Sequence, residues 1–193
     1  MDKTALISSA ISYISSLFAA DAGGHDAGHT LRVYQNAMRI AAEEPGADEL
    51  VVALAALLHD ADDHKLFHTE NNENARHFLR GNDLSEATIE AVITAVNSVS
   101  FSQNQGRTPE TLEGKIVQDA DRLDAMGAVG IARTFAYGGE HGRPMEASVQ
   151  HFYDKLLRLK DLMNTESARR IAAERYAFLV AYLEELRKET EAE

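Results

Sequence analysis

The sequence contains no cysteine. This absence excludes disulfide bonds, thiolate nucleophiles and thiolate metal ligands. Any metal ion must therefore be bound by histidine, aspartate, glutamate or neutral oxygen atoms. At 193 residues the chain is long enough to bury roughly 70% of its unfolded surface, so it needs neither a disulfide nor a structural metal in order to fold.

Basic residues are scarce as well. Nineteen Lys and Arg stand against 31 Asp and Glu, which gives a formal net charge of −12. Binding to a nucleic-acid backbone needs a basic patch, and we therefore expect no nucleic-acid partner. A small anionic substrate is compatible with this charge if a metal ion and a few Lys or Arg side chains offset the field locally.

Long hydrophobic runs are also missing. No apolar run approaches the ~20 residues that a membrane-spanning helix needs, so we expect no membrane segment. The N-terminal stretch MDKTALISSAISYISSLFAADAG carries Asp2, lacks a basic cluster and mixes serine with apolar residues. This pattern favours an amphipathic first helix over a signal peptide. The expected location is the cytoplasm.

Prolines are few, and each marks a boundary. Pro45, Pro109 and Pro144 lie in polar stretches with a glycine nearby, where proline is typical of a break between helices. Elsewhere apolar residues recur at helical spacing, and no alternating strand pattern of any length appears. The sequence therefore predicts an all-α fold, with residues 1–193 forming a single helical domain.

Several helices can be placed from the spacing of apolar residues. Residues 3–20 and 27–43 each predict one helix, and NARHFLR predicts a short helix that stops at Gly81. The run LVVALAALLHD is apolar all round, which is typical of a central, buried helix. The last helix is expected to present one apolar side made of Ile171, Phe178, Tyr182 and Leu186.

Helix boundaries are predicted from capping patterns. Asp83 and Glu86 stand at capping-box spacing ahead of ATIEAVITAV. Thr108 followed by Pro109 predicts the start of the helix that contains TLEGKIVQDADRLDAM. Gly127 either ends this helix or bends it, and the sequence leaves both possibilities open.

The stretch LLHDADDHKLF, residues 57–67, ends the buried run with polar side chains. An ionised carboxylate against a dry core costs several kcal/mol or more unless it is paired or bound to a metal. His59 and Asp60 end the predicted central helix, so we expect them to point inward or toward a cavity. Adjacent helical residues lie ~100° apart, but both side chains can still meet one ion between them. The alternative is an aspartate that surfaces beside a packed histidine.

Two further residues point inward by helical spacing. His29 stands four residues before Val33 and eight before Ala37, on the apolar side of its helix. The alternative for His29 is a buried histidine hydrogen-bonded to a carbonyl. Asp121 stands four residues after Val117 and is therefore expected to point toward the core as well.

We expect two neighbouring aspartates to differ in their exposure to solvent. Asp119 lies four residues after Lys115 and three before Arg122, a spacing that supports surface ion pairs, so we expect it to be mostly solvated. Asp124 lies three residues after Asp121 and is a weaker inward candidate.

Together, these positions make a candidate metal site. His29, His59, Asp60 and Asp121 supply two imidazoles and two carboxylates from three predicted helices. Such a set suits Mn²⁺, Fe²⁺, Co²⁺, Ni²⁺ or Zn²⁺, with one or two positions left for water and substrate.

The same segments resemble a known family. H-x-x-R-V at residues 29–33, HD at residues 59–60 and ADRLDA at residues 120–125 resemble the HD-domain superfamily of metal-dependent phosphohydrolases. HDADDHK, LDAMGAVGIARTF and GGEHGRP are similar to one bacterial branch of small soluble members. The resemblance covers about residues 24–135. It implies a compact helical bundle with additional N- and C-terminal helices.

The resemblance also implies site residues and a cofactor. It makes His29, His59, Asp60 and Asp121 the ligands of one divalent ion, with Mn²⁺ favoured and Mg²⁺ also possible. Nucleotidases of the superfamily have an acidic residue, usually Glu, three positions after the doublet as general acid or base. Asp63 holds that position here and lies nearly one turn beyond Asp60 if the helix continues. The alternative is a solvated acid, and the shorter Asp makes a nucleotidase less favoured.

Two basic residues are candidates for contact with a substrate phosphate. Lys65 is the only Lys or Arg in DADDHKLF, and pairing with Asp62 is its alternative role. Arg143 in the loop GGEHGRP can close over a substrate, or it is a surface charge. His64 and His68 have i, i+4 spacing, but the pattern provides no carboxylate partner for a Zn²⁺ site of their own.

The function that the resemblance implies is hydrolysis of a small phosphorylated molecule, with a nucleotide favoured. We expect a nucleoside triphosphate pyrophosphohydrolase in preference to a 5′-nucleotidase or another phosphomonoesterase. A non-catalytic regulatory module that binds a metal or a nucleotide is the alternative from another class. A homodimer is a further possibility, and no arrangement of aromatic residues identifies a base clamp.

Overall fold

The computed structural model describes residues 2–19, 27–64, 66–99 and 107–190. In this part of the chain the regular elements are helices and no strand occurs, which confirms the predicted all-α class. None of these helices is both long and apolar enough to cross a membrane. The chain divides into two compact units, residues 1–121 and 122–193, and each is described by itself. The single domain over residues 1–193 stays a prediction.

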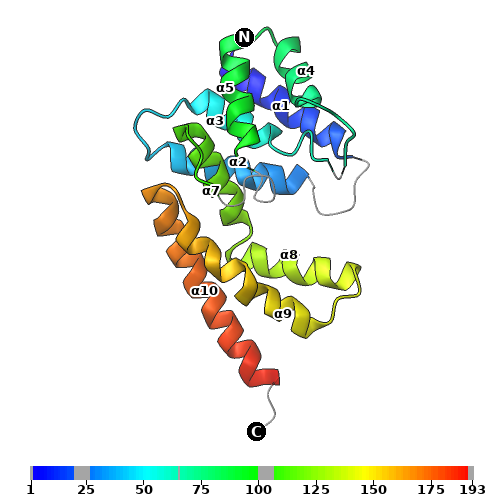
Figure 1. Ribbon diagram of the computed structural model, residues 1–193, viewed down its shortest axis with the longest axis vertical. Coiled ribbons are helices and arrows are strands. Elements are labelled where there is room, and N and C mark those ends of the chain that lie inside the picture. The colour runs from blue at the N-terminus through cyan, green and yellow to red at the C-terminus, as the bar shows by residue number, and fades with distance from the viewer. Residues whose placement is uncertain (1, 20–26, 65, 100–106, 191–193) are drawn as a thin grey trace. The chain divides into compact units, whose positions relative to one another are not determined.

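The first unit is arranged around α3, drawn in cyan in Figure 1. This helix packs against α1, α2 and α5, and α4 packs against α5. The helices of this unit, the last of which ends just inside the second unit, are α1 (Lys3–Leu17), α2 (Ala27–Ala41), α3 (Glu49–Leu58), α4 (Glu73–Gly81), α5 (Glu86–Asn97) and α7 (Leu112–Asp124).

Helix α3 is buried all round, as its sequence predicts. All eight residues from Val51 to Leu58 are buried. Its N-terminus is capped by Asp48, whose carboxylate accepts hydrogen bonds from the backbone N–H groups of Leu50 (2.9 Å) and Val51 (3.2 Å). An acidic cap of this kind satisfies donors that the first turn of a helix leaves unpaired. The C-terminus of α3 delivers His59, which is the C-cap residue.

Helix α2 presents its apolar side to the core. Val33, Ala37 and Ile40 are all fully buried, which confirms the inward side predicted from their spacing. The side-chain amide of Asn36, which is also buried, donates to the carbonyl oxygen of Ala120 at 3.4 Å and so joins α2 to α7. His29 lies on the same buried side, with 5% of its surface exposed.

Two predicted helix starts were wrong. Helix α5 is capped by Ser85, whose hydroxyl accepts from the backbone N–H of Thr88 at 3.2 Å. Asp83 cannot act as the cap, because its φ of 55° places it in the left-handed region. Helix α7 begins at Leu112 rather than near Thr108, and the hydroxyl of Thr111 accepts from the N–H of Gly114 at 3.1 Å. In both cases a hydroxyl nearer the helix took the capping position.

The second unit begins at the break that the sequence left open. Helix α7 ends at Asp124, and Gly127 starts α8 with a φ of 68° that favours glycine. The chain therefore forms two separate helices here instead of one bent helix. The elements that follow are α8 (Gly127–Glu140), α9 (Met145–Asp154), a 3₁₀ segment η1 (Leu156–Leu162) and α10 (Glu166–Thr190).

The apolar side predicted for the last helix was wrong in part. Phe178 is 52% exposed, whereas its neighbour Leu179 is fully buried. Adjacent helical residues differ in direction by ~100°, so a row chosen one position away points to solvent. The buried apolar row of α10 consists of Ala168, Ile171, Ala172, Leu179 and Leu183.

Close backbone packing at Gly130 gives a test of this unit. A Cβ at Gly130 would meet the carbonyl group of Ala125 far inside van der Waals contact. We expect Gly130→Ala to lower the free energy of unfolding by about 1–3 kcal/mol, as is typical of overpacking, measured by urea denaturation.

Gly139 in the same helix is the matched control, because a Cβ there has no atom within 4 Å. Gly139→Ala is expected to leave the stability unchanged or to raise it by up to about 1 kcal/mol. Equal behaviour of the two variants would contradict the packing described for Gly130.

Candidate metal centre

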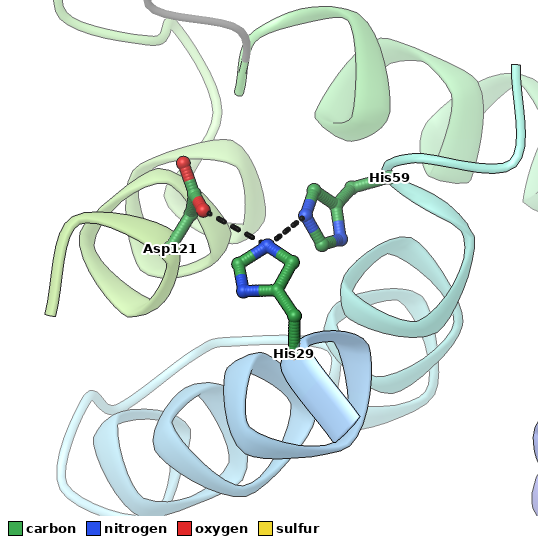
Figure 2. A group of neighbouring side chains, drawn as sticks. All are labelled: His29, His59 and Asp121. Atoms are coloured by element: carbon green, nitrogen blue, oxygen red, sulfur yellow. Dashed lines mark hydrogen bonds and ion pairs between the residues drawn. The ribbon is translucent and has the colours of Figure 1, made fainter. Parts of the chain in front are cut away.

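Three side chains converge in the first unit (Figure 2). The Nε2 atom of His29 lies 3.3 Å from Nε2 of His59 and 3.4 Å from a carboxylate oxygen of Asp121. Each residue offers one ligand atom, and these atoms all lie within 4.8 Å of one another. The group matches three of the four metal ligands predicted from the sequence.

The fourth predicted ligand, Asp60, lies against both imidazoles. Its Oδ2 atom is 3.3 Å from Nε2 of His59 and 3.5 Å from Nε2 of His29. The structure therefore brings together all four candidates, with Asp60 and Asp121 each in contact with His29. Residues that are 92 positions apart in the sequence, His29 and Asp121, meet because α2 and α7 are joined in the core.

The imidazoles are more enclosed than the carboxylates. The side chains of His59 and His29 are 3% and 6% exposed, while those of Asp60 and Asp121 are 16% and 31% exposed. The site is thus closed on the histidine side and open on the side of Asp121. A partly open position is what a metal site needs in order to admit water or a ligand.

The ring of His59 is oriented by the backbone. Its Nδ1 atom lies 2.9 Å from the carbonyl oxygen of Ala56, and a carbonyl can only accept, so Nδ1 carries the proton of this contact. This arrangement leaves Nε2 to face the other three side chains. Metal-binding histidines are commonly oriented by such a hydrogen bond from the second ring nitrogen.

The distances within the group fit a single divalent ion. With metal–ligand distances of about 2.0–2.2 Å, atoms at neighbouring coordination positions lie about 3.0–3.5 Å apart. The four contacts that His29 and His59 make with each other, Asp60 and Asp121 fall between 3.3 and 3.5 Å. Two imidazole nitrogens and two carboxylates are also a donor set that suits first-row transition ions.

The electrostatics favour a positive charge at this point. Burial has the largest single effect on the pKa of His59 and lowers it, but the charge and hydrogen bond of Asp60, with the charge of Asp121 and the carbonyl of Ala56, raise it more. The net result is a pKa of about 9 instead of 6.5. The nearby carboxylates therefore stabilise either a proton or a metal cation beside His59.

Asp63, the predicted acid–base residue, follows the doublet in a turn and not in a helix. Helix α3 ends at Leu58, so the helical geometry assumed for Asp63 was wrong. The backbone N–H of Asp63 instead donates to the carbonyl oxygen of Asp60 at 3.1 Å. Its side chain is 15% exposed, with a carboxylate oxygen 3.6 Å from Nδ1 of His64.

The two predicted phosphate contacts remain predictions. Lys65 lies outside the described residues. Arg143 belongs to the second unit, where its guanidinium lies 5.2 Å from the centre of the Tyr137 ring. Among the described residues, the group of ligand atoms that can hold a metal does not include His64 or His68.

Of the expectations for the two neighbouring aspartates, the one for Asp119 was wrong and the one for Asp124 is confirmed. Asp119 is fully buried and not solvated. Its predicted partner Arg122 is buried too and donates to the carbonyl oxygen of Leu162. Asp124 is inward as predicted, but its carboxylate pairs with Arg133 at 2.5 Å, so it does not add to the candidate metal ligands.

The four candidate ligands lie in the part of the chain that matches a known protein family. The family model for the HD domain matches residues 26–126, which include all four candidate ligands. An uncharacterized protein of Bacillus subtilis, YpgQ, is 38% identical over 185 residues, which cover 92% of this chain and 90% of YpgQ.

Two solved structures are similar over nearly the whole chain. The crystal structure of Bacillus subtilis YpgQ in complex with ADP has a TM-score of 0.83 and 36% identity, covering 96% of this chain and 98% of that one. The crystal structure of an HD-superfamily hydrolase from Bacillus thuringiensis has a TM-score of 0.83 and 36% identity, covering both chains completely.

The raised pKa of His59 gives a pH-dependent test in protein stripped of metal with a chelator. A pKa of about 9 in the folded state and 6.5 in the unfolded state means that protonation of His59 stabilises the fold fully below pH 6.5. This contribution is lost as the pH rises toward 9. We expect urea denaturation of the metal-free protein to show a lower free energy of unfolding at pH 9.5 than at pH 6.

A His59→Asn variant provides the control, because its asparagine does not titrate in this range. The fall in stability between pH 6 and pH 9.5 is expected to be smaller in the variant than in the wild type by the contribution of His59. An identical fall in both proteins would mean that Asp60 and Asp121 do not act on His59 as described.

Proposed function

Because this chain belongs to the HD-domain family, we propose that it is a metal-dependent phosphohydrolase that acts on a nucleotide. We favour cleavage of a nucleoside triphosphate to the monophosphate and pyrophosphate. The observation that carries the proposal is the convergence of the imidazoles of His29 and His59 with the carboxylates of Asp60 and Asp121 at 3.3–3.5 Å.

The similar proteins support the same chemical class. The related structure from Bacillus thuringiensis is that of an HD-superfamily hydrolase. The related YpgQ structure contains ADP, which supports a nucleotide as the ligand of this chain as well. Mn²⁺ is the ion we favour, since carboxylate and imidazole ligands with open positions suit it.

All four converging side chains bind the ion, and the two carboxylates also offset its charge. A bound divalent ion lowers the pKa of a water molecule and polarises a phosphoryl oxygen. His29 and His59 bind through neutral nitrogens, so they add no charge. Asp60 and Asp121 contribute two negative charges, which leaves a site with a divalent ion close to neutral. A nearly neutral site admits a phosphate more readily than the net charge of −12 would suggest.

Asp63 is proposed as the group that accepts a proton during the reaction. Attack of a water oxygen on the α-phosphorus forms one P–O bond. The bond between that phosphorus and the bridging oxygen breaks, and its electron pair leaves with pyrophosphate. The proton of the attacking water passes to the Asp63 carboxylate. Partial burial of this carboxylate, 15% exposed, suits a general base that must not be fully solvated.

The function is tested by metal content and by the product pattern together. Bound Mn, Fe, Co, Ni and Zn are measured in the purified protein, and release of phosphate and pyrophosphate is screened across nucleotides with added Mn²⁺. We expect pyrophosphate from nucleoside triphosphates, and neither metal nor turnover in a His59→Ala variant. A His68→Ala variant is the matched control and should behave as the wild type.

Other outcomes select other functions. Release of phosphate alone from nucleoside monophosphates would replace the proposal with a nucleotidase. Metal binding without turnover of any nucleotide would favour a non-catalytic binding module. Metal content that is unchanged in His59→Ala would contradict the site itself.

The role of Asp63 is tested by a change that keeps its shape and removes its charge. We expect Asp63→Asn to lower kcat by about 10²-fold or more, the typical contribution of general acid–base catalysis, with Mn²⁺ still bound. Asp161→Asn, at a side chain that is 77% exposed, is the control and should keep wild-type kcat. Full activity of Asp63→Asn would show that another group moves the proton.

A further inference from the structure

The segment after α3 is held by consecutive turns. The backbone N–H of Ala61 donates to the carbonyl oxygen of Leu58 at 3.0 Å, and that of Asp63 donates to Asp60 at 3.1 Å. The carbonyl oxygen of Asp63 then accepts from Leu66 at 2.9 Å. We call residues 59–64 the doublet segment. Turns of this kind are weaker than a helix, so the doublet segment depends on tertiary contacts to keep its shape.

Asp62 provides such a contact. One oxygen of its carboxylate accepts from the backbone N–H of Asn74 at 2.9 Å, and the other accepts from that of Ala75 at 3.0 Å. Asn74 and Ala75 are the second and third residues of α4. Both N–H groups belong to the first turn of that helix, where backbone donors lack partners within the helix.

Asp62 therefore caps α4 from outside that helix. The residue at the N-cap position, Asn72, is in the left-handed conformation and makes no capping hydrogen bond with its side chain. A carboxylate at a helix N-terminus is also favoured by the helix dipole. The negative charge of the Asp62 carboxylate strengthens its two hydrogen bonds. The same bonds satisfy two backbone N–H groups of α4 that have no partner within the helix.

A side chain of α4 binds the backbone of the doublet segment in turn. The side-chain amide of Asn74 donates to the carbonyl oxygen of Ala61 at 2.8 Å, next to Asp62. The hydroxyl of Tyr13, on α1, donates to the carbonyl oxygen of Asn74 at 3.0 Å. Three hydrogen bonds hold the doublet segment to α4, and a fourth ties α4 to α1.

The position of Asp62 links this joint to the candidate metal centre. Asp60, two residues before it, contacts both imidazoles, and Asp63 follows it directly. Both oxygens of Asp62 accept hydrogen bonds from α4, so its carboxylate acts there as an anchor and not as a metal ligand. Movement of the segment at Asp62 would move Asp60 and Asp63 together.

We propose that Asp62 is a positioning residue of the metal centre: it anchors the doublet segment to the N-terminus of α4 and so holds Asp60 against the imidazoles. The part that concerns Asp63 rests on the proposed function, whereas the part that concerns Asp60 needs only that the site binds a metal. Residues that orient metal ligands typically change metal affinity by 10- to 100-fold when they are replaced.

The test compares Mn²⁺ affinity with stability. Asp62→Asn keeps one acceptor oxygen but turns an amide NH₂ toward the second N–H donor. We expect this variant to bind Mn²⁺ about tenfold more weakly than the wild type, measured by calorimetric titration. Hydrogen exchange of residues 59–64 is expected to be faster, and kcat is expected to fall with little change in KM.

A second variant and a matched control complete the test. Asn74→Ala removes only the bond to Ala61, and we expect it to weaken Mn²⁺ binding in the same direction, by about threefold. Asp48→Ala removes the single carboxylate oxygen that accepts from two backbone N–H groups of α3. It is expected to lower the denaturation midpoint as Asp62→Asn does, but to leave Mn²⁺ affinity unchanged.

The outcomes are distinguishable. Wild-type Mn²⁺ affinity in both Asp62→Asn and Asn74→Ala would overturn the positioning role, and so would an equal loss of affinity in Asp48→Ala. If Asp62→Asn does not fold, Asn74→Ala decides alone. If the wild type binds Mn²⁺ but hydrolyses no nucleotide, the proposed function fails while the Mn²⁺ titration still tests the position of Asp60.

Discussion

The close contact of two enclosed imidazoles with two carboxylates is the constraint that the rest of the first unit has to maintain. The Nε2 atoms of His29 and His59 lie 3.3 Å apart, and Asp60 and Asp121 lie beside them at similar distances. Lone pairs and negative charge that meet at one point in a poorly hydrated place are unfavourable unless a proton or a metal ion lies among them. The raised pKa of His59 means that a positive charge is stabilised at this point. A divalent ion supplies two positive charges where a proton supplies one.

The surrounding fold keeps these groups from relaxing apart. Helix α3 is apolar on every side and is buried from Val51 to Leu58, so it cannot rotate to expose His59 without exposing hydrocarbon, at about 25 cal/mol per Å². Asn36 joins α2 to α7, which fixes the helices that carry His29 and Asp121. The site is therefore assembled by hydrophobic packing at some distance from the polar atoms, and its local charge is a consequence of that packing.

The sequence predicted the parts of this arrangement that follow from helical periodicity. The burial of α3, the inward direction of His29 and the positions of His59 and Asp121 are all read from rows of apolar neighbours, and the structure agrees with them. Asp119 was misjudged because α7 is buried on more than one side, which a spacing rule for surface pairs does not consider. Asp62 gave no local signal, since its partners Asn74 and Ala75 are 12 and 13 residues away and become neighbours only in the folded chain.

The end of α3 at Leu58 also affects where the carboxylate of Asp63 lies. If α3 continued through Asp63, the backbone of Asp63 would lie one turn beyond Asp60 and its short side chain would reach less far than that of Glu. In the turns observed here, the backbone of Asp63 is instead set by its bond to Asp60 and by the anchor at Asp62. The position of the Asp63 carboxylate therefore depends on where α4 holds the segment. The proton transfer proposed for Asp63 therefore depends on the hydrogen bonds of Asp62 as well as on the length of the Asp63 side chain.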